Sequence, residues 1–152
     1  MSKLSPLYAG LPVRITVSGQ PVPKARPRVY NGHGITPAKT KAAEARIRAE
    51  YLKKYAGCKP FDEEIVMHVA FYMQDRRRVD YDNLAKLVTD ALNGIAYVDD
   101  SQIVESIIYK VLPSTLVEGR RGVRQRRSGD PLDWEPHTEI RLEKVQKATE
   151  SI

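Results

Sequence analysis

The sequence predicts a small α+β domain in which a β-sheet of about four strands carries two packed helices. Four segments have the alternation or the β-branched and aromatic content of strands, and two longer segments have the composition and spacing of helices. The strand segments are residues 13–17, 65–72, 103–111 and 137–143, and the helices start near residues 38 and 82. The length suits one hydrophobic core, so we expect a single domain over residues 1–152 with a basic insertion at about residues 113–136.

The first strand alternates apolar and polar residues from Val13 to Val17, and Gly19 closes it. Residues 20–34 then contain three prolines and two glycines, which forbid regular structure over most of that length. A stiff proline-rich loop could present its cations to successive phosphates of a DNA strand. We therefore favour DNA contact by its basic residues over a loop that is merely solvated. These residues are Lys24, Arg26 and Arg28.

The first helix has a start signal in Thr36 and Pro37, which combine a capping hydroxyl with a proline at the first helical position. Strong helix formers continue from Ala38 to about Tyr55, and Gly57 ends the pattern. We expect the apolar face of this helix to consist of Ala45, Ala49 and Leu52.

The second strand, from Ile65 to Tyr72, is apolar on both alternating sets, as expected for a central strand covered on both faces. Within it, His68 is interpreted as a histidine with protein partners rather than as a metal ligand. A polar connector follows, and its three arginines are expected to hold phosphate oxygens of DNA. They are Arg76, Arg77 and Arg78.

The second helix has the clearest pattern in the chain, because its apolar residues follow the i, i+3, i+4, i+7 spacing of one helix face. They are Leu84, Leu87, Val88, Ala91, Leu92 and Ile95. At about 100° per residue, Asp82, Lys86 and Asp90 fall on the opposite face, which is free for chemistry. Asn93 and Gly94 end this helix.

The last two strands complete the predicted sheet. A polar turn at Asp99, Asp100 and Ser101 precedes the alternating strand from residue 103 to residue 111. A short strand at about residues 137–143 is expected to turn Ile140 and Leu142 inward.

The composition narrows the class of function. The chain has 25 Lys and Arg against 19 Asp and Glu, a formal charge of +6 that favours a polyanionic partner such as nucleic acid. Cys58 is the single cysteine, so no disulfide forms within the chain and a zinc site built on thiolates is excluded. Neither a membrane span nor a secretion signal is expected, which predicts a cytoplasmic protein.

Three aspartates lie at the ends of predicted elements, where catalytic side chains are often found: Asp80, Asp82 and Asp100. We expect the fold to gather them, and three gathered carboxylates need a divalent cation with hard oxygen ligands, Mg²⁺ or Mn²⁺. Such a metal lowers the pKa of bound water and promotes hydrolysis of a phosphodiester. Lys86, one helical turn after Asp82, is placed to stabilise the negative charge that develops at phosphorus.

Each of these residues also has a purely structural interpretation. Asp80 or Asp82 could cap the helix, Asp82 with Lys86 could be an ordinary i, i+4 pair, and Asp99 with Asp100 could form only a turn. A D-x-D spacing alone does not decide between these interpretations and a metal site.

A longer pattern favours the catalytic interpretation. Residues 75–86 read DRRRVDYDNLAK, residues 90–93 read DALN and residues 98–103 read VDDSQI. Together they resemble the RusA family of crossover-junction endodeoxyribonucleases, the Holliday-junction resolvases. The run GQPVPKARPR at residues 19–28, followed by Thr36 and Pro37, resembles the phage and Gram-positive branch of that family.

The resemblance implies a small mixed α/β fold, metal-binding catalytic carboxylates at Asp80, Asp82 and Asp100, and an essential basic residue at Lys86, with Asp99 a less certain neighbour. It also implies a homodimer that presents two Mg²⁺ sites to a four-way DNA junction in the cytoplasm of a bacterial or phage-infected cell. The insertion with its arginines at residues 120–127 departs from the family pattern. Two other functions stay open: a non-catalytic DNA-binding module, and a metal-dependent nuclease for flap or single-stranded DNA.

Overall fold

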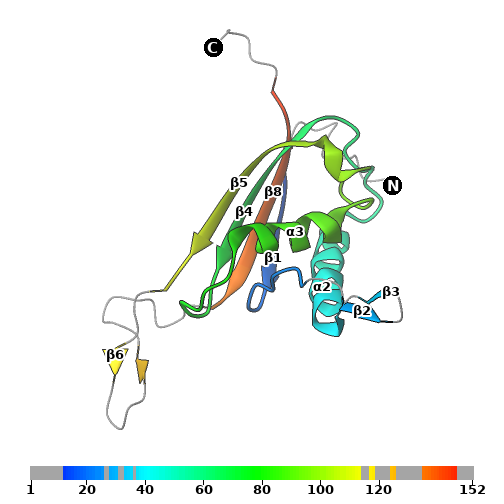
Figure 1. Ribbon diagram of the computed structural model, residues 1–152. Coiled ribbons are helices and arrows are strands. Elements are labelled where there is room, and N and C mark those ends of the chain that lie inside the picture. Colours follow the sequence, from blue (N-terminus) through cyan, green and yellow to red (C-terminus); the bar gives the residue numbers. More distant parts are fainter. Residues whose placement is uncertain are drawn as a thin grey trace.

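A four-stranded mixed sheet carries two helices in the computed structural model, which confirms the predicted fold class (Figure 1). The residues that the structure describes are 12–25, 28–30, 33–35, 37–113, 117–118, 124–125 and 135–146. In spatial order the strands of the sheet are β1 (Val13–Ser18), β8 (His137–Lys144), β4 (Ile65–Tyr72) and β5 (Ile103–Val111). The helices α2 (Ala38–Tyr55) and α3 (Tyr81–Leu92) lie on the same side of this sheet.

Strand β8 lies between β1 and β4 and is antiparallel to both. β4 and β5 are parallel, and the connection between them runs through α3. A parallel pair needs such a crossover, because a short hairpin can join only antiparallel strands. Helix α3 is therefore the helix of a βαβ unit.

The core lies between the sheet and the helices. In β1 the buried residues Val13, Ile15 and Val17 alternate with exposed ones, as the period of two predicts. In β8 the predicted inward residues Ile140 and Leu142 are 2% and 0% exposed. The alternation expected from the sequence is thus confirmed in both antiparallel strands.

Helix α3 buries the predicted apolar face almost completely. Its buried residues are Leu84, Ala85, Leu87, Val88, Ala91 and Leu92. Asp82 and Lys86 on the opposite face are exposed, as expected, but Asp90 on the same face is only 25% exposed and has an ion pair with Lys24. The helix ends at Asn93, and Gly94 follows with φ of 80°, a conformation that costs glycine little.

Helix α2 buries a different face from the one predicted. Thr40, Ala43, Ile47 and Tyr51 are buried, whereas Ala45, Ala49 and Leu52 are exposed, Leu52 to 46%. The prediction was wrong because it weighted two alanines, and Ile47 and Tyr51 bury far more apolar surface than alanines can. The first half of the helix has only alanines as its apolar residues, and their short side chains gave little apolar signal to choose between the faces.

The start of α2 is displaced by one residue from the prediction. Pro37 is the N-cap residue rather than the first helical residue, and no side chain caps the helix there. Thr36, the predicted cap, lies outside the described residues. The missing N–H of Pro37 costs no hydrogen bond, because the first amides of a helix have no intrahelical partner.

Two short ribbons lie outside the main sheet. The strands β2 (Arg28–Tyr30) and β3 (His33–Ile35) form a hairpin in the segment for which we predicted mainly irregular structure. In the predicted insertion, β6 (Val117–Glu118) pairs with β7 (Arg124–Gln125). The predicted insertion residues Arg120, Arg121, Arg126 and Arg127 lie outside the described residues.

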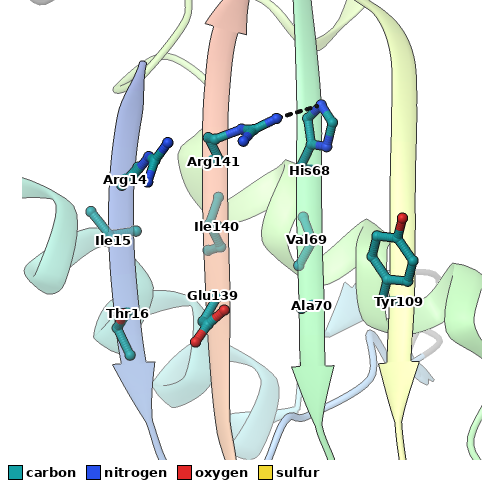
Figure 2. Close-up of a pocket in the computed structure, with 10 residues that line it drawn as sticks. All are labelled: Arg14, Ile15, Thr16, His68, Val69, Ala70, Tyr109, Glu139, Ile140 and Arg141. Carbon is teal, nitrogen blue, oxygen red and sulfur yellow. Dashed lines mark hydrogen bonds between the residues drawn. The ribbon is translucent and has the colours of Figure 1, made fainter. Parts of the chain in front are cut away.

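No described helix or strand covers the sheet face turned away from α2 and α3, which corrects the expectation that β4 is covered on both faces. A hollow of about 430 Å³ lies on this face. Figure 2 shows the side chains of Arg14, His68, Tyr109 and Arg141 in front of the strands, with the helices behind. His68 does have protein partners, because its Nε2 lies 3.2 Å from the Arg141 guanidinium. Within the described residues, no helix combines the length and the apolarity needed to cross a membrane.

The tight packing of α3 predicts the effect of a cavity there. Leu84 is fully buried, so Leu84→Ala should lower the free energy of unfolding by about 3 kcal/mol. Urea denaturation followed by circular dichroism measures this loss. Val104→Ala is the control, since Val104 is 52% exposed and should change stability by less than about 0.5 kcal/mol. Equal losses in both variants would contradict the packing of α3 described above.

Candidate active site

Two of the predicted catalytic carboxylates lie at the entrance of α3. Asp80 is the N-cap residue of this helix, yet its side chain makes no capping hydrogen bond. The Asp82 carboxylate accepts only a local hydrogen bond from the backbone N–H of Asn83, at 3.0 Å. Both residues are exposed. The Asp80 carboxylate is therefore not used to cap the helix, and the carboxylates of Asp80 and Asp82 both face solvent.

The third carboxylate, Asp100, begins the short 3₁₀ helix η1 (Asp100–Gln102). Its neighbour Asp99 caps this turn, because its Oδ2 accepts the Ser101 N–H at 3.0 Å while the Gln102 side chain accepts the Asp99 N–H at 2.8 Å. The hydrogen bond from Ser101 holds the pKa of Asp99 below its usual value. Asp99 thus has a structural role that accounts for its presence beside Asp100.

The turn at η1 is fixed beside the C-terminal end of α3. The Gln102 side-chain amide donates to the carbonyl oxygens of Phe61 and Glu63, at 2.7 and 2.9 Å. Phe61 in turn donates its N–H to the carbonyl of Ala96, four residues after the end of α3. Gln102 therefore ties η1 to the turn that follows the helix, and no local sequence pattern announces this role.

Tyr97 reinforces that turn from inside the protein. It is fully buried, and its hydroxyl donates to the carbonyl oxygen of Thr89 in α3. Burial raises the pKa of Tyr97, and the negative charges of Asp100 and Asp90 nearby raise it further. Asp100 and Asp90 thus both lie near the Tyr97 hydroxyl, which places Asp100 on the C-terminal side of α3.

The structure does not bring the three predicted carboxylates together in one chain. Asp80 and Asp82 are at the first turn of α3, and Asp100 follows its last turn; a helix of 12 residues is about 18 Å long. In the part of the chain that the structure describes, no group of three or more His, Cys, Asp or Glu side chains is placed to hold a metal ion. The expected gathering is absent from these residues because the sequence locates element ends but not the distance between them.

Lys86 lies midway along the exposed face of α3. Its ammonium is 3.7 Å from the Asp90 carboxylate, an i, i+4 pair, and its side chain is 63% exposed. The ion pair is thus with the aspartate after Lys86 rather than with Asp82 before it. Surface pairs of this kind contribute little to stability, so Lys86 is free to turn toward a phosphate.

Lys24, for which DNA contact stays a prediction, has ion pairs with two carboxylates of the chain. Its Nζ lies 2.6 Å from Glu44 of α2 and 3.1 Å from Asp90 of α3, and only 18% of its side chain is exposed. Its backbone N–H donates to the carbonyl of Asn83 at 2.8 Å. Lys24 therefore fastens the loop after β1 to both helices.

The charge of Lys24 is stabilised by this arrangement. Partial burial alone lowers the pKa of Lys24, but the hydrogen bonds and the negative charges of Glu44 and Asp90 outweigh burial and raise the pKa above 10.5. The neighbouring predicted DNA contacts are less defined, since Arg26 lies outside the described residues and Arg28 belongs to β2. Whether they contact DNA stays a prediction.

The three arginines before α3 have different surroundings. Arg76 donates to the carbonyl of Pro113 at 2.7 Å, which ties the connector to the end of β5. Arg77 is 85% exposed and has a loose ion pair with Asp75, at 3.4 Å. Arg78 is also exposed. All three arginines are exposed, but part of the Arg76 guanidinium is used by the bond to Pro113, so Arg77 and Arg78 are the more available to a ligand.

A comparison with known protein families matches residues 18–118 to endodeoxyribonuclease RusA, which is well over half of the chain. The chain belongs to the RusA family. All the predicted catalytic and DNA-binding residues of this RusA chain fall inside the matched range, whereas β8 lies beyond it. No curated protein matches the chain significantly. The narrower assignment to the phage and Gram-positive branch stays a prediction.

The Lys24 contacts predict a loss of stability that an ordinary surface lysine does not show. Lys24→Gln leaves the mostly buried Glu44 with only a distant partner in Arg48, at 3.7 Å, and should cost about 2 kcal/mol of unfolding free energy. Because the folded-state pKa of Lys24 is raised, the contribution is present below pH 10.5 and is lost as the pH rises through the folded pKa.

Urea denaturation of both proteins at pH 7 measures this difference. Lys53→Gln is the matched control, since Lys53 has a similar bond to Glu50 but is 72% exposed, and its loss should stay under about 1 kcal/mol. Equal urea midpoints for the two variants would show that the ion pairs of Lys24 do not stabilise the packing of the loop after β1 against α2 and α3.

Proposed function

We propose that this RusA-family chain is a metal-dependent endonuclease that resolves four-way DNA junctions by paired phosphodiester hydrolysis. The observation that carries the proposal is the family match over residues 18–118, which includes both acidic motifs and Lys86. The net charge of +6 is consistent with a DNA substrate. The proposed role is repair and recombination of DNA.

Asp80, Asp82 and Asp100 are proposed to hold Mg²⁺, with Mn²⁺ as a substitute. Their donor chemistry fits, because carboxylate oxygens are the hard ligands that these cations prefer. Their positions within one chain do not fit, because Asp100 lies beyond the far end of α3 from Asp80. When bound, the metal supplies a water of lowered pKa and neutralises phosphate charge.

Lys86 is proposed to contact the scissile phosphate. Its ammonium is exposed on the free face of α3 and carries only one distant partner, Asp90. A cation at that position stabilises negative charge that develops on the phosphoryl oxygens during cleavage. Arg77 and Arg78 are proposed to hold neighbouring phosphates, because guanidinium groups suit phosphate oxygens and position a duplex without reading its sequence.

The active form is proposed to be a homodimer. A four-way junction has two opposed strands to cut, and a symmetric dimer presents two equivalent sites to them. Light scattering gives the mass of the particle in solution, which should be twice that of the 17.2 kDa chain.

The central test is the removal of one proposed metal ligand. Asp80→Asn should abolish cleavage of a synthetic four-way junction in Mg²⁺ while binding, measured by gel shift in EDTA, is retained. The reason is that the amide keeps the shape of the side chain but loses the charge that binds the metal. Undiminished cutting by Asp80→Asn would refute the proposed site.

The choice of substrate separates this proposal from a flap or single-strand nuclease and from a non-catalytic DNA-binding module. The wild-type protein is incubated with a four-way junction, a flap, a single strand and a linear duplex at one salt concentration, because affinity for phosphates changes steeply with salt. Preferential cutting of the junction is expected. Equal cutting of all four would exclude a resolvase, and no cutting of any would favour the binding module.

The exposed arginines should contribute to binding rather than to chemistry. Arg77→Gln removes one accessible cation, so the slope of log K against log salt should fall by about 1 with little change in the cleavage rate at saturation. Fluorescence anisotropy with a labelled junction at four salt concentrations gives the slope. Lys53→Gln, on α2, serves as the control and should leave the slope unchanged.

A further inference from the structure

We infer that the outer sheet face, the side of the sheet that carries Arg14, His68, Tyr109 and Arg141, binds unpaired nucleotides of a nucleic-acid strand. In this binding site a base stacks on Tyr109, and Arg14 and Arg141 contact the phosphates. The site lies across the sheet from the helices, and so away from the proposed cleavage site on α3 (Figure 2). The inference goes beyond the proposed function and does not depend on it, because binding is measured without a metal.

The Tyr109 ring is the platform for a base. It is 59% exposed, and it lies in front of the strands with the helices behind (Figure 2). Its register partner on β4 is Ala70, whose side chain ends at Cβ and leaves the hollow open beside the ring. Every base has a flat aromatic face, so an exposed ring of this kind binds unpaired bases with little regard to their identity.

A row of basic side chains crosses the same face. Arg14 of β1 is the register partner of Arg141 of β8, and Arg141 is in turn the partner of His68 of β4. Three basic residues therefore lie at one level on three adjacent strands. Like charges directly opposite one another destabilise a sheet, and an anion bound between the two guanidinium groups offsets that repulsion.

The arginines have charge available for such an anion. The Arg14 side chain is exposed and, within the described residues, its guanidinium has no ion pair. Arg141 has one ion pair, with Glu143 at 3.3 Å, and its buried Nε has no hydrogen-bond partner among these residues. The hollow itself is lined by both arginines and by Glu139, whose carboxylate lies 3.2 Å from His137. The cations therefore outnumber the carboxylate there.

The spacing of ring and cations fits a nucleotide. Tyr109 lies one strand across and two residues along from His68, which sets their Cα atoms about 8 Å apart. The Arg141 guanidinium reaches to 3.2 Å from the Nε2 of His68. A base on the ring therefore has its own phosphate close to Arg141. Cations beside an exposed aromatic ring on an open surface are the usual means of binding single strands.

Fluorescence anisotropy with a short labelled oligothymidine in EDTA tests the base contact. Tyr109→Ala should weaken binding about tenfold, because it removes the stacking of one base. Tyr109→Phe keeps the ring and should bind as tightly as the wild-type protein. Because Tyr109 is mostly exposed, both variants should fold, and circular dichroism checks this. Unchanged binding by Tyr109→Ala would overturn the inference.

Tyr81→Ala is the matched control. Tyr81 is 60% exposed, almost the same fraction as Tyr109, but it is the first residue of α3 on the other side of the sheet. This variant should bind the oligothymidine as tightly as the wild-type protein. An equal loss of affinity in Tyr81→Ala and Tyr109→Ala would show that the strand does not choose the outer sheet face.

The salt dependence tests the phosphate contacts. Arg14→Gln should reduce the slope of log K against log salt by about 0.7, the value for one phosphate of a single strand. Lys53→Gln is the control, since the Lys53 ammonium is bonded to Glu50 at 3.0 Å, and it should leave the slope unchanged. A wild-type slope in Arg14→Gln would refute the contact between Arg14 and the strand.

Competition separates unpaired nucleotides from other polyanions. Unlabelled oligothymidine should displace the labelled strand better than a linear duplex or polyglutamate of equal charge, because a duplex keeps its base faces stacked and polyglutamate has none. Equal displacement by all three would show that charge alone holds the strand and would overturn the inference. A wild-type protein that cuts no junction but shows the expected competition would refute the proposed function and leave this inference standing.

Discussion

The burial of one face of α3 is the constraint on which the candidate site depends. Leu84, Leu87, Val88 and Leu92 are at most 2% exposed, so the helix has one rotational position against the sheet. Turning it by the angle of a single residue would carry exposed, charged side chains toward the core, where an unpaired charge costs several kcal/mol. The exposure of the acidic and basic residues on the other face is thus a by-product of apolar packing.

The sequence predicted this helix well and the other helix poorly, for a physical reason. In α3 the spacing of large aliphatic residues leaves only one face that can be buried. In α2 the exposed Leu52 and the buried Ile47 and Tyr51 gave competing faces, and the packing partner decided between them. The wrong face for α2 and the correct one for α3 therefore reflect how strongly each local pattern constrains the tertiary contact.

Long-range contacts account for what could not be predicted at the site. Lys24 meets Glu44 across 20 residues, and it meets Asp90 in a third element. Nothing in a proline-rich basic loop distinguishes a lysine that binds DNA from one that binds carboxylates. Gln102 likewise finds its two carbonyl partners about 40 residues earlier in the chain. The sequence therefore shows which polar residues lie near the site, but it does not show which distant residues they bond to.

The basic composition likewise does not reveal the partners of the individual basic side chains. The net charge of +6 says that the chain favours polyanions, but it does not say which cations are available. Lys24 is neutralised by its partners and Arg76 is bound to a carbonyl, while Arg77 remains in solvent. Availability is set by the surroundings of each side chain, so a basic stretch of sequence overstates the number of groups that can meet a phosphate.

The insertion of β8 between β1 and β4 has a consequence for how the chain is made. β1 precedes β4 and β5 in the chain, but among the described strands it pairs only with β8, so this pairing waits until the ribosome has synthesised residues 137–142. The loop that carries Lys24 follows β1 directly. A growing chain can therefore form the β4–α3–β5 unit early, but it completes the described sheet only after β8 has emerged.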